Sequence, residues 1–364
     1  MPQLATAVVA AVGGESRMTP VAVLGATGAV GGRFVEVVAG EGRAPVRALV
    51  HRWWHTARLV RVPVALREVA TTDADGFASP LAGCEVAVSF IDGPDAEATV
   101  AAALVEGCTR AGVGRLVHLG CLGSFGAVTT GRLDEALDPP RPADADPARR
   151  WAFERELLDA GRRSGVDVVV VTSSLIYGPF TERGAHIPRD QVARGRVAVA
   201  AGSGPCHLVY VDDVVEAVWA AVRAQPPVRG RVFVSGPAPT TWAAFYEAFE
   251  PIVGRPAVAV LDDDELAAFV QADPAVRAEL RWPPPPSPGR RLVRAVHRRT
   301  GTLGSEPPPR RRLVLPDPDE LAARAAHVVV PLDRAAEVLG WAPVVDLDEG
   351  MRRTAAYLRW ADPS

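Results

Sequence analysis

The first half of the chain alternates short apolar runs with helical patterns, and this alternation limits the possible folds more than any other feature. Six apolar runs have the length and composition of buried strands: Val21–Leu24, Val46–Val50, Val62–Leu66, Val86–Ile91, Leu116–Leu119 and Val166–Val171. Helical patterns lie between them, at Gly31–Ala39, Ala96–Ala111 and Arg149–Ser164. Strands separated by helices form βαβ units with helices on both faces of a parallel sheet. The sequence therefore predicts an α/β fold with a doubly wound parallel sheet.

A glycine-rich turn follows the first predicted strand. The sequence Gly25-Ala-Thr-Gly28-Ala-Val-Gly31 lies between a buried strand and a helix start, the context that the dinucleotide-binding fingerprint requires. Gly25 permits the tight turn, Gly28 lets the backbone approach a pyrophosphate, and Gly31 permits close packing of helix and strand. The residues expected to bind the cofactor here are Gly25, Thr27, Gly28, Ala29, Val30 and Gly31. The alternative is a glycine-rich turn that binds nothing.

The end of the second predicted strand bears on the choice of nucleotide. An NAD-selective site usually has Asp or Glu there to bond the ribose hydroxyls, whereas this chain reads Arg47-Ala-Leu-Val-His51-Arg52. Arg52, with help from His51 or Arg58, can pair with the 2′-phosphate of NADP through two parallel hydrogen bonds. The sequence therefore favours NADP over NAD as the cofactor, and a solvated surface arginine is the alternative.

Charge and composition exclude several classes of function. The chain has 364 residues, 40 basic and 43 acidic, and its formal charge of −3 gives no overall field to attract a nucleic acid. All 40 basic residues are arginine, so the chain contains no lysine. Mechanisms that need a lysine, such as a P-loop, a Schiff base or a Tyr-x-x-x-Lys pair, are therefore excluded.

Cysteine spacing and hydropathy bear on the cellular compartment. The four cysteines are widely spaced, with no Cys-x-x-Cys pair, which favours reduced thiols. The apolar stretch Leu4–Val12 is far shorter than the roughly 20 residues of a membrane span, and no basic residue precedes it. We therefore expect a cytoplasmic protein without a membrane partner.

The order of predicted elements divides the chain into unequal parts. After Tyr177 the alternation is less regular, but a predicted helix at Asp212–Arg223 and strand at Arg231–Ser235 continue the first pattern. The expected parts are a loose N-terminal extension (1–17), a dinucleotide-binding domain (18–180, with 207–235 returning to it) and a smaller interleaved C-terminal substrate lobe (181–206 and 236–364). Residues of about 282–312 are rich in Pro and Arg, which predicts an irregular, solvated insertion. The alternatives for this segment are a mobile cover or a surface that contacts a partner, because both can have the same composition.

The glycine-rich turn is the first of five motifs that follow one another along the chain. They are Gly25-Ala-Thr-Gly28-Ala-Val-Gly31, Arg115-Leu-Val-His-Leu-Gly-Cys-Leu-Gly-Ser-Phe-Gly126, Ile176-Tyr177-Gly178-Pro179, Val209-Tyr-Val-Asp-Asp213 and Leu339-Gly-Trp-Ala-Pro343. Together they resemble the extended short-chain dehydrogenase/reductase family, of the NAD-dependent epimerase/dehydratase type, over about Thr19–Trp360. The resemblance implies a Rossmann-type cofactor domain and a small-molecule substrate. A homodimer is the one protein partner we expect.

The proton-relay residues of that family do not appear in this chain. The family combines Ser or Thr at the end of the fifth strand with a Tyr-x-x-x-Lys helix, in which Lys lowers the pKa of the catalytic Tyr. Counting back from Phe125-Gly126 places Cys121 at the hydroxyl position. Aligning the helix places Asp146 at the tyrosine position and Arg150 at the lysine position. Arg150 stays protonated and can hold a nicotinamide ribose or a phosphate, whereas Asp146 is too strong an acid to replace a phenol.

Four other side chains are candidates for the missing chemistry. Cys121 can act as a nucleophile or weak acid if a nearby charge lowers its pKa, and Ser124 can supply the missing hydroxyl. Tyr177 lies in the turn expected at the mouth of the substrate pocket, where it can bind or protonate a substrate. His207 precedes the Val-Asp-Asp turn and can act as an acid or base near neutral pH. The structural alternatives are a core thiol, a loop serine, a packed tyrosine and a surface histidine.

Histidine placement does not indicate a metal site. Of the seven histidines, only His51 and His55 have a ligand-like spacing, and their Arg-rich surroundings would repel a cation. His118 lies between apolar neighbours and is interpreted as structural.

Three functions fit a chain that keeps the glycine-rich turn and lacks the Tyr/Lys pair. The first is an NAD(P)-dependent oxidoreductase or epimerase that acts on a small organic molecule with a non-standard acid/base set. The second is a redox-neutral dehydratase, cyclase or isomerase on the same fold. The third is a non-catalytic NAD(P)-binding regulatory module. The positions of Tyr177 and His207 near the expected substrate pocket favour an enzyme of the first kind.

Overall fold

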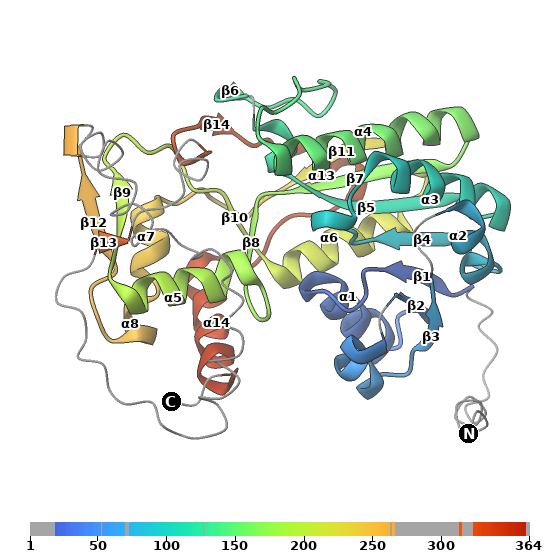
Figure 1. The fold of residues 1–364 in the computed structure, drawn as a ribbon, viewed down its shortest axis with the longest axis horizontal. Coiled ribbons are helices and arrows are strands. Elements are labelled where there is room, and N and C mark those ends of the chain that lie inside the picture. The colour runs from blue at the N-terminus through green and yellow to red at the C-terminus, as the bar shows by residue number, and fades with distance from the viewer. Residues whose placement is uncertain are drawn as a thin grey trace.

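A seven-stranded parallel sheet forms the centre of the protein, in a computed structural model that describes residues 19–51, 53–69, 73–126, 128–262, 264–265, 313–314 and 323–361. The strand order is β11-β7-β5-β4-β1-β2-β3 (Figure 1). In chain order the strands are β1 (Val21–Leu24), β2 (Val46–Val50), β3 (Ala65–Glu68), β4 (Val86–Ser89), β5 (Arg115–Cys121), β7 (Asp167–Ser173) and β11 (Gly230–Val234). The order reverses between β1 and β4, which confirms the predicted doubly wound, Rossmann-type α/β fold.

Helices cover both faces of this sheet. They are α1 (Ala29–Gly40) and α6 (Val211–Arg223) on one face, and α2 (Ala74–Leu81), α3 (Ala98–Ala111) and α4 (Ala145–Ser164) on the other. Val23 of β1 belongs to the same buried cluster as Phe34 of α1. Leu24, the next residue in the strand, belongs to the cluster of Leu104 on the opposite face. The strands are continuous apolar runs because both of their faces are buried.

A second, smaller lobe is built from later segments of the chain and lies at the left of Figure 1. Its elements are β8 (Leu175–Tyr177), η4 (Glu182–His186), α5 (Ile187–Arg194), β9 (Arg196–Ala200), β10 (Leu208–Tyr210), α7 (Trp242–Glu247), α8 (Glu250–Val253), β12 (Val258–Leu261), β13 (Leu313–Val314) and α14 (Leu347–Ala361). Strand β9 lies between β12 and β13, and β8 pairs with β10. Buried aromatic residues, among them Phe245 and Phe249, form the core of this lobe.

Short elements connect the lobe to the central sheet. Strand β6 (Thr130–Arg132) pairs with β14 (His327–Val329), and α13 (Asp333–Leu339) packs against β11 and α6. These pairings join segments that are far apart in the sequence. Arg334 of α13 donates to the carbonyl oxygens of Arg229 and Arg231, so α13 packs at the amino end of β11.

The third strand differs from its prediction. The apolar run Val62–Leu66 predicts a strand, but β3 begins at Ala65 because residues 62 and 63 form a bend after η1 (Trp53–Arg61). Pro63 has no N–H group to donate to a strand ladder, which favours this later start. The predicted N-terminal extension and the Pro/Arg-rich segment at 282–312 lie outside the described residues.

Two searches of the described residues bear on membrane and metal binding. No helix in this part of the chain is both long and apolar enough to cross a bilayer. The same residues contain no cluster of three or more His, Cys, Asp or Glu side chains arranged to hold a metal ion.

Candidate active site

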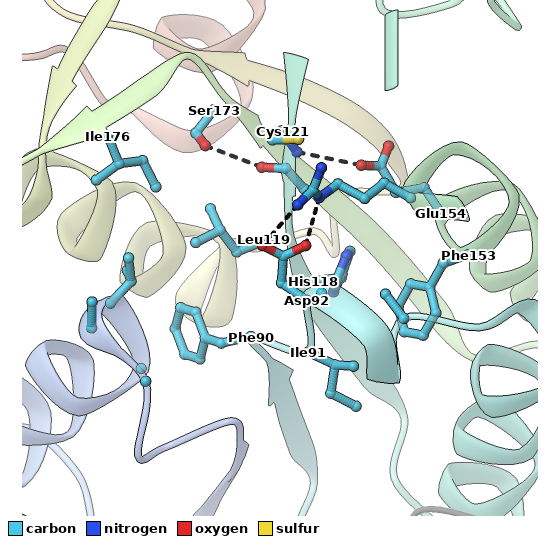
Figure 2. Close-up of a pocket in the computed structure, with 18 residues that line it drawn as sticks. Phe90, Ile91, Asp92, His118, Leu119, Cys121, Phe153, Glu154, Ser173 and Ile176 are labelled. Carbon is cyan, nitrogen blue, oxygen red and sulfur yellow. Dashed lines mark hydrogen bonds and ion pairs between the residues drawn. The ribbon is translucent and has the colours of Figure 1, made fainter. Parts of the chain in front are cut away.

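A cavity of about 430 Å³ lies at the carboxyl ends of the central strands, where the strand order reverses. Its walls include the first turn of α1 (Gly28–Gly31), the segment after β4 (Phe90–Gly93), the end of β5 (His118–Cys121), and Arg150 and Glu154 of α4. Figure 2 shows the side chains of this region around Cys121. Ligands of doubly wound sheets bind at this kind of crevice.

The glycine-rich turn has the geometry of an anion-binding helix start. Gly25 has φ +71°, and a Cβ atom there would lie 2.8 Å from the carbonyl oxygen of Phe90. A Cβ atom on Gly31 would lie 2.3 Å from the carbonyl oxygen of Gly25, so turn and helix touch at this point. Gly28 has φ −73°, which suits any residue, but a Cβ atom there would lie 3.3 Å from the carbonyl oxygen of Gly25, which is a tight contact. Gly28 is exposed and lines the cavity, where the N–H groups at the start of α1 can face an anion.

The predicted cofactor-binding residues of this turn divide into two groups. Gly28, Ala29, Val30 and Gly31 line the cavity. Gly25 and half-buried Thr27 form the turn before them and are not part of its wall.

His51, which follows β2, is not part of the cavity wall. His51 is exposed and Arg52 lies outside the described residues. The Arg58 guanidinium donates to the carbonyl oxygen of Ala29 at 3.2 Å and to Glu36 Oε2 at 2.8 Å. Arg58 is thus held beside the first turn of α1 by a carboxylate partner.

Arg150 brings a permanent positive charge to the cavity wall. Its Nε donates to Asp92 Oδ1 at 2.6 Å, and Nη1 bonds to Asp146 one helical turn earlier. Burial opposes the charged form, but Cys121, Asp92 and Asp146 together raise the pKa of Arg150 above that of an ordinary arginine. Asp146 also pairs with Arg149 and, at 3.5 Å, with Arg183 from η4. Asp146 is therefore an ion-paired carboxylate in the first turn of α4.

The structure separates the two candidates at the end of β5. Cys121 is half-buried and lines the cavity. Burial raises its pKa to about 11 although Arg150 lowers it, so the side chain is a protonated thiol at neutral pH. Ser124 of η3 (Leu122–Phe125) is fully buried and does not line the cavity. Its hydroxyl donates to Glu154 Oε1 at 2.6 Å. The expectation that a nearby charge activates Cys121 is thus corrected, because burial outweighs the charge of Arg150.

Tyr177 and His207 lie outside the cavity wall, contrary to the expectation from their motifs. Tyr177 is 2% exposed, and its hydroxyl donates to the carbonyl oxygen of Asp346 at 3.0 Å. His207 is half-buried, with Nε2 2.9 Å from the carbonyl oxygen of Val328. The segments before α14 and within β14 cover these two side chains and bind their polar atoms.

Glu154 is a cavity residue that sequence reasoning missed. It lies one helical turn after Arg150, is 1% exposed, and accepts hydrogen bonds from Ser124 Oγ and, at 3.3 Å, from the Cys121 N–H. Burial raises its pKa to about 7. A signal was available in the sequence, because Glu154 follows Phe153 and precedes Leu157 and Leu158 on the buried face of α4.

His118 has a neutral imidazole ring at this site. Its Nδ1 lies 3.2 Å from Ser89 Oγ, and burial lowers its pKa to about 4. The ring packs against Phe153 with centroids 5.1 Å apart and contributes to the cavity wall.

The fold and this site define a Rossmann-type nucleotide-binding protein whose cavity combines a helix start, a fixed cation and a thiol. A family model for the NAD dependent epimerase/dehydratase family matches residues 21–236, more than half of the chain. The chain therefore belongs to the NAD-dependent epimerase/dehydratase family. A search of curated proteins finds no matching relative.

Solved structures with the same fold cover nearly the whole chain. MoeE5 in complex with UDP-glucose and NAD is 17% identical with a TM-score of 0.63, over 94% of this chain and 99% of that one. UDP-glucuronic acid 4-epimerase from Bacillus cereus, in complex with UDP-glucuronic acid and NAD, is 14% identical with a TM-score of 0.68, over 94% and 100% of the two chains. At these identities the likeness shows the fold.

Proposed function

We propose that the chain is an NAD(P)-dependent oxidoreductase or epimerase that acts on a small organic molecule with a non-standard acid/base set. The observation that carries this proposal is the cavity at the reversal of strand order, whose wall includes the exposed Gly28 and the first turn of α1. A glycine at the start of this helix lets a ligand come close to the backbone N–H groups. The cavity continues from there to Arg150 and Cys121.

The residues present give each part of this site a chemical role. A nicotinamide nucleotide supplies hydride transfer when it is bound. The N–H groups of Gly28–Gly31 would hold its pyrophosphate, and Arg150 would hold a ribose or a phosphate. The protonated thiol of Cys121 would donate a weak hydrogen bond to a substrate oxygen, at the position where the family has a hydroxyl.

NADP is the nucleotide that the end of β2 favours. The strand ends at Val50 and is followed by His51 and Arg52, so the residues there offer no carboxylate to the ribose hydroxyls. Arg52 would bind the 2′-phosphate, and Arg58 adds a second positive charge beside the first turn of α1.

A calorimetric titration of NADP⁺ and NAD⁺ tests the proposal. We expect tighter binding of NADP⁺, and a loss of at least about tenfold for both nucleotides in Gly28→Ala, because the added methyl group blocks the pyrophosphate. Gly114→Ala is the matched control, since a Cβ atom there meets nothing within 4 Å. Arg52→Ala should weaken NADP⁺ alone, by about tenfold to a hundredfold. Normal binding by Gly28→Ala would contradict the proposed site.

A non-catalytic NAD(P)-binding module is the second candidate. One observation favours it: Asp146 and Arg150, at the tyrosine and lysine positions of the family, are bonded to each other. UDP-glucose and UDP-glucuronic acid, the sugar nucleotides in the similar structures, are suitable first probes. A change of nicotinamide absorbance with either probe supports an enzyme, and tight nucleotide binding without turnover of a wider set of alcohols favours the module.

A further inference from the structure

Glu154 is a buried acid in the cavity wall that the proposed function does not use. Its Oε1 accepts hydrogen bonds from Ser124 Oγ at 2.6 Å and from the Cys121 N–H at 3.3 Å. Its Oε2 has no hydrogen-bond partner among the described residues. The carboxyl group is thus fixed through one oxygen, while the other lacks the donors that a buried carboxylate needs.

The charges around Glu154 come from three elements. Arg231 of β11 is 6% exposed, and its Nε lies 3.8 Å from Glu154 Oε2. Its Nε and Nη2 have no hydrogen-bond partner in the described part of the chain. Arg150 contributes positive charge from α4 itself, and the thiol of Cys121 faces Glu154 from β5. The ion pair with Arg231 is long and not hydrogen-bonded, so it stabilises the carboxylate only in part. Burial outweighs these interactions and raises the pKa of Glu154 to about 7.

A ligand that brings charge into this cavity must therefore change the ionisation of Glu154. The oxidised nicotinamide ring carries a positive charge and the reduced ring carries none. The helix start at Gly28–Gly31 places the phosphate end of a nucleotide at one side of the cavity, which leaves the side of Cys121 and Glu154 for the ring. An opposite charge a few ångströms away favours the carboxylate and lowers a carboxyl pKa by about one unit or more.

We propose that Glu154 takes up and releases a proton in this cavity: it is a carboxylic acid while the cavity holds no oxidised nicotinamide ring, and a carboxylate while the oxidised ring of a nicotinamide nucleotide occupies the cavity. The O–H bond of the acid breaks on binding, and the proton passes to the buffer. This inference rests on the proposed nucleotide site. It makes binding of the oxidised nucleotide tighter as pH rises through about 7, whereas binding of the reduced nucleotide gains nothing.

Calorimetry in two buffers of different protonation enthalpy counts the protons released. NADP⁺ and NADPH are titrated in parallel near pH 7, because their shared 2′-phosphate then contributes equally to both. We expect the oxidised nucleotide to release a few tenths of a proton more than the reduced one in the wild-type protein. Glu154→Gln should abolish that difference. The glutamine keeps an oxygen for Ser124 and for the Cys121 N–H, so it preserves the hydrogen bonds of the wall.

A second variant tests the same inference if Glu154→Gln folds poorly. Ser124→Ala removes a hydrogen bond that stabilises the carboxylate, so the pH at which proton release is largest should rise. An equal difference in proton release in the wild type and in Glu154→Gln would overturn the inference, as would nucleotide binding without any difference. A chain that binds neither nucleotide would contradict the proposed function itself.

Discussion

The hydroxyl of Tyr177 stabilises the fold through a single buried hydrogen bond. It donates to the carbonyl oxygen of Asp346 at 3.0 Å, and 2% of the residue is exposed. Tyr177→Phe removes this hydrogen bond, which costs about 0.5–1.5 kcal/mol, because the carbonyl oxygen of Asp346 keeps the Gly350 N–H as its other donor. We expect urea unfolding to show this loss of stability while the affinity for NADP⁺ is unchanged. Weaker nucleotide binding at unchanged stability would instead connect this hydroxyl with the cofactor.

The sequence could predict which residues line the cavity where a local turn places them. It could not predict the positions of residues whose hydrogen-bond partners are far away in the sequence. Gly28 and Cys121 were placed by the local strand–turn–helix and strand–loop patterns, and both line the cavity. The partners of Tyr177 and His207 are 169 and 121 residues away in the sequence. No local pattern indicates that Asp346 and Val328 cover these side chains. Glu154 was missed although Phe153, Leu157 and Leu158 mark the same buried face of α4, because charged residues are rarely buried.

At the level of elements, the start of α6 holds the segment between α13 and α14. Asp213 is 3% exposed, and its Oδ2 accepts hydrogen bonds from the N–H groups of Val344 at 3.2 Å and Val345 at 3.0 Å. The indole N–H of Trp341 donates to the carbonyl oxygen of Asp213 at 3.0 Å. Helix α6 therefore positions the chain that leads into α14.

Removing the carboxylate of Asp213 should loosen this attachment. We expect Asp213→Ala to lower the free energy of unfolding by about 2–3 kcal/mol, because the buried N–H of Val345 and the part-buried N–H of Val344 lose a charged acceptor. Asp212→Ala is the control, since Asp212 pairs with Arg33 at a partly exposed site and such pairs contribute about 0–1 kcal/mol. Both are measured by urea unfolding. Equal losses of unfolding free energy in the two variants would show that the hydrogen bonds to Val344 and Val345 contribute no more to stability than the ion pair of Asp212.

The central strands of the sheet could be predicted from the sequence because both faces of these strands are buried. Strands β1 and β2 have the predicted bounds, since continuous apolar runs indicate strands covered on both faces. The second lobe offered no comparable pattern. Strand β9 pairs with β12 and β13, whose residues lie about sixty and more than a hundred positions later. Such pairings depend on tertiary contacts, which cannot be predicted from the sequences of short strands.

Over the whole molecule, Phe180 joins the two lobes. Its ring centroid lies 3.9 Å from the Arg58 guanidinium of η1 and 4.6 Å from the ring of Tyr357 in α14. Its backbone has φ +67°, the left-handed region that costs an ordinary residue about 1–2 kcal/mol. The contacts across the two lobes must therefore hold this residue in place.

Two substitutions at Phe180 separate the contacts from the strain. Phe180→Ala and Phe180→Gly both lose the ring, but only glycine adopts this backbone at no steric cost. We expect the glycine variant to be more stable than the alanine variant by about 1 kcal/mol, and both to be less stable than the wild type. Chemical denaturation of the three proteins checks this order. An alanine variant as stable as the glycine variant would mean that the turn relaxes once the ring is removed.

The charge of Arg150 cannot be removed by the acetylation that neutralises lysine side chains. Arg150 lies in the cavity wall and pairs with Asp92 and Asp146. Acetylation neutralises lysine side chains, but it has no side-chain target in a chain whose 40 basic residues are all arginine. The positive charge of the cavity is therefore insensitive to the acetyl-donor supply of a cell, and it persists at alkaline pH where an amine would lose its proton.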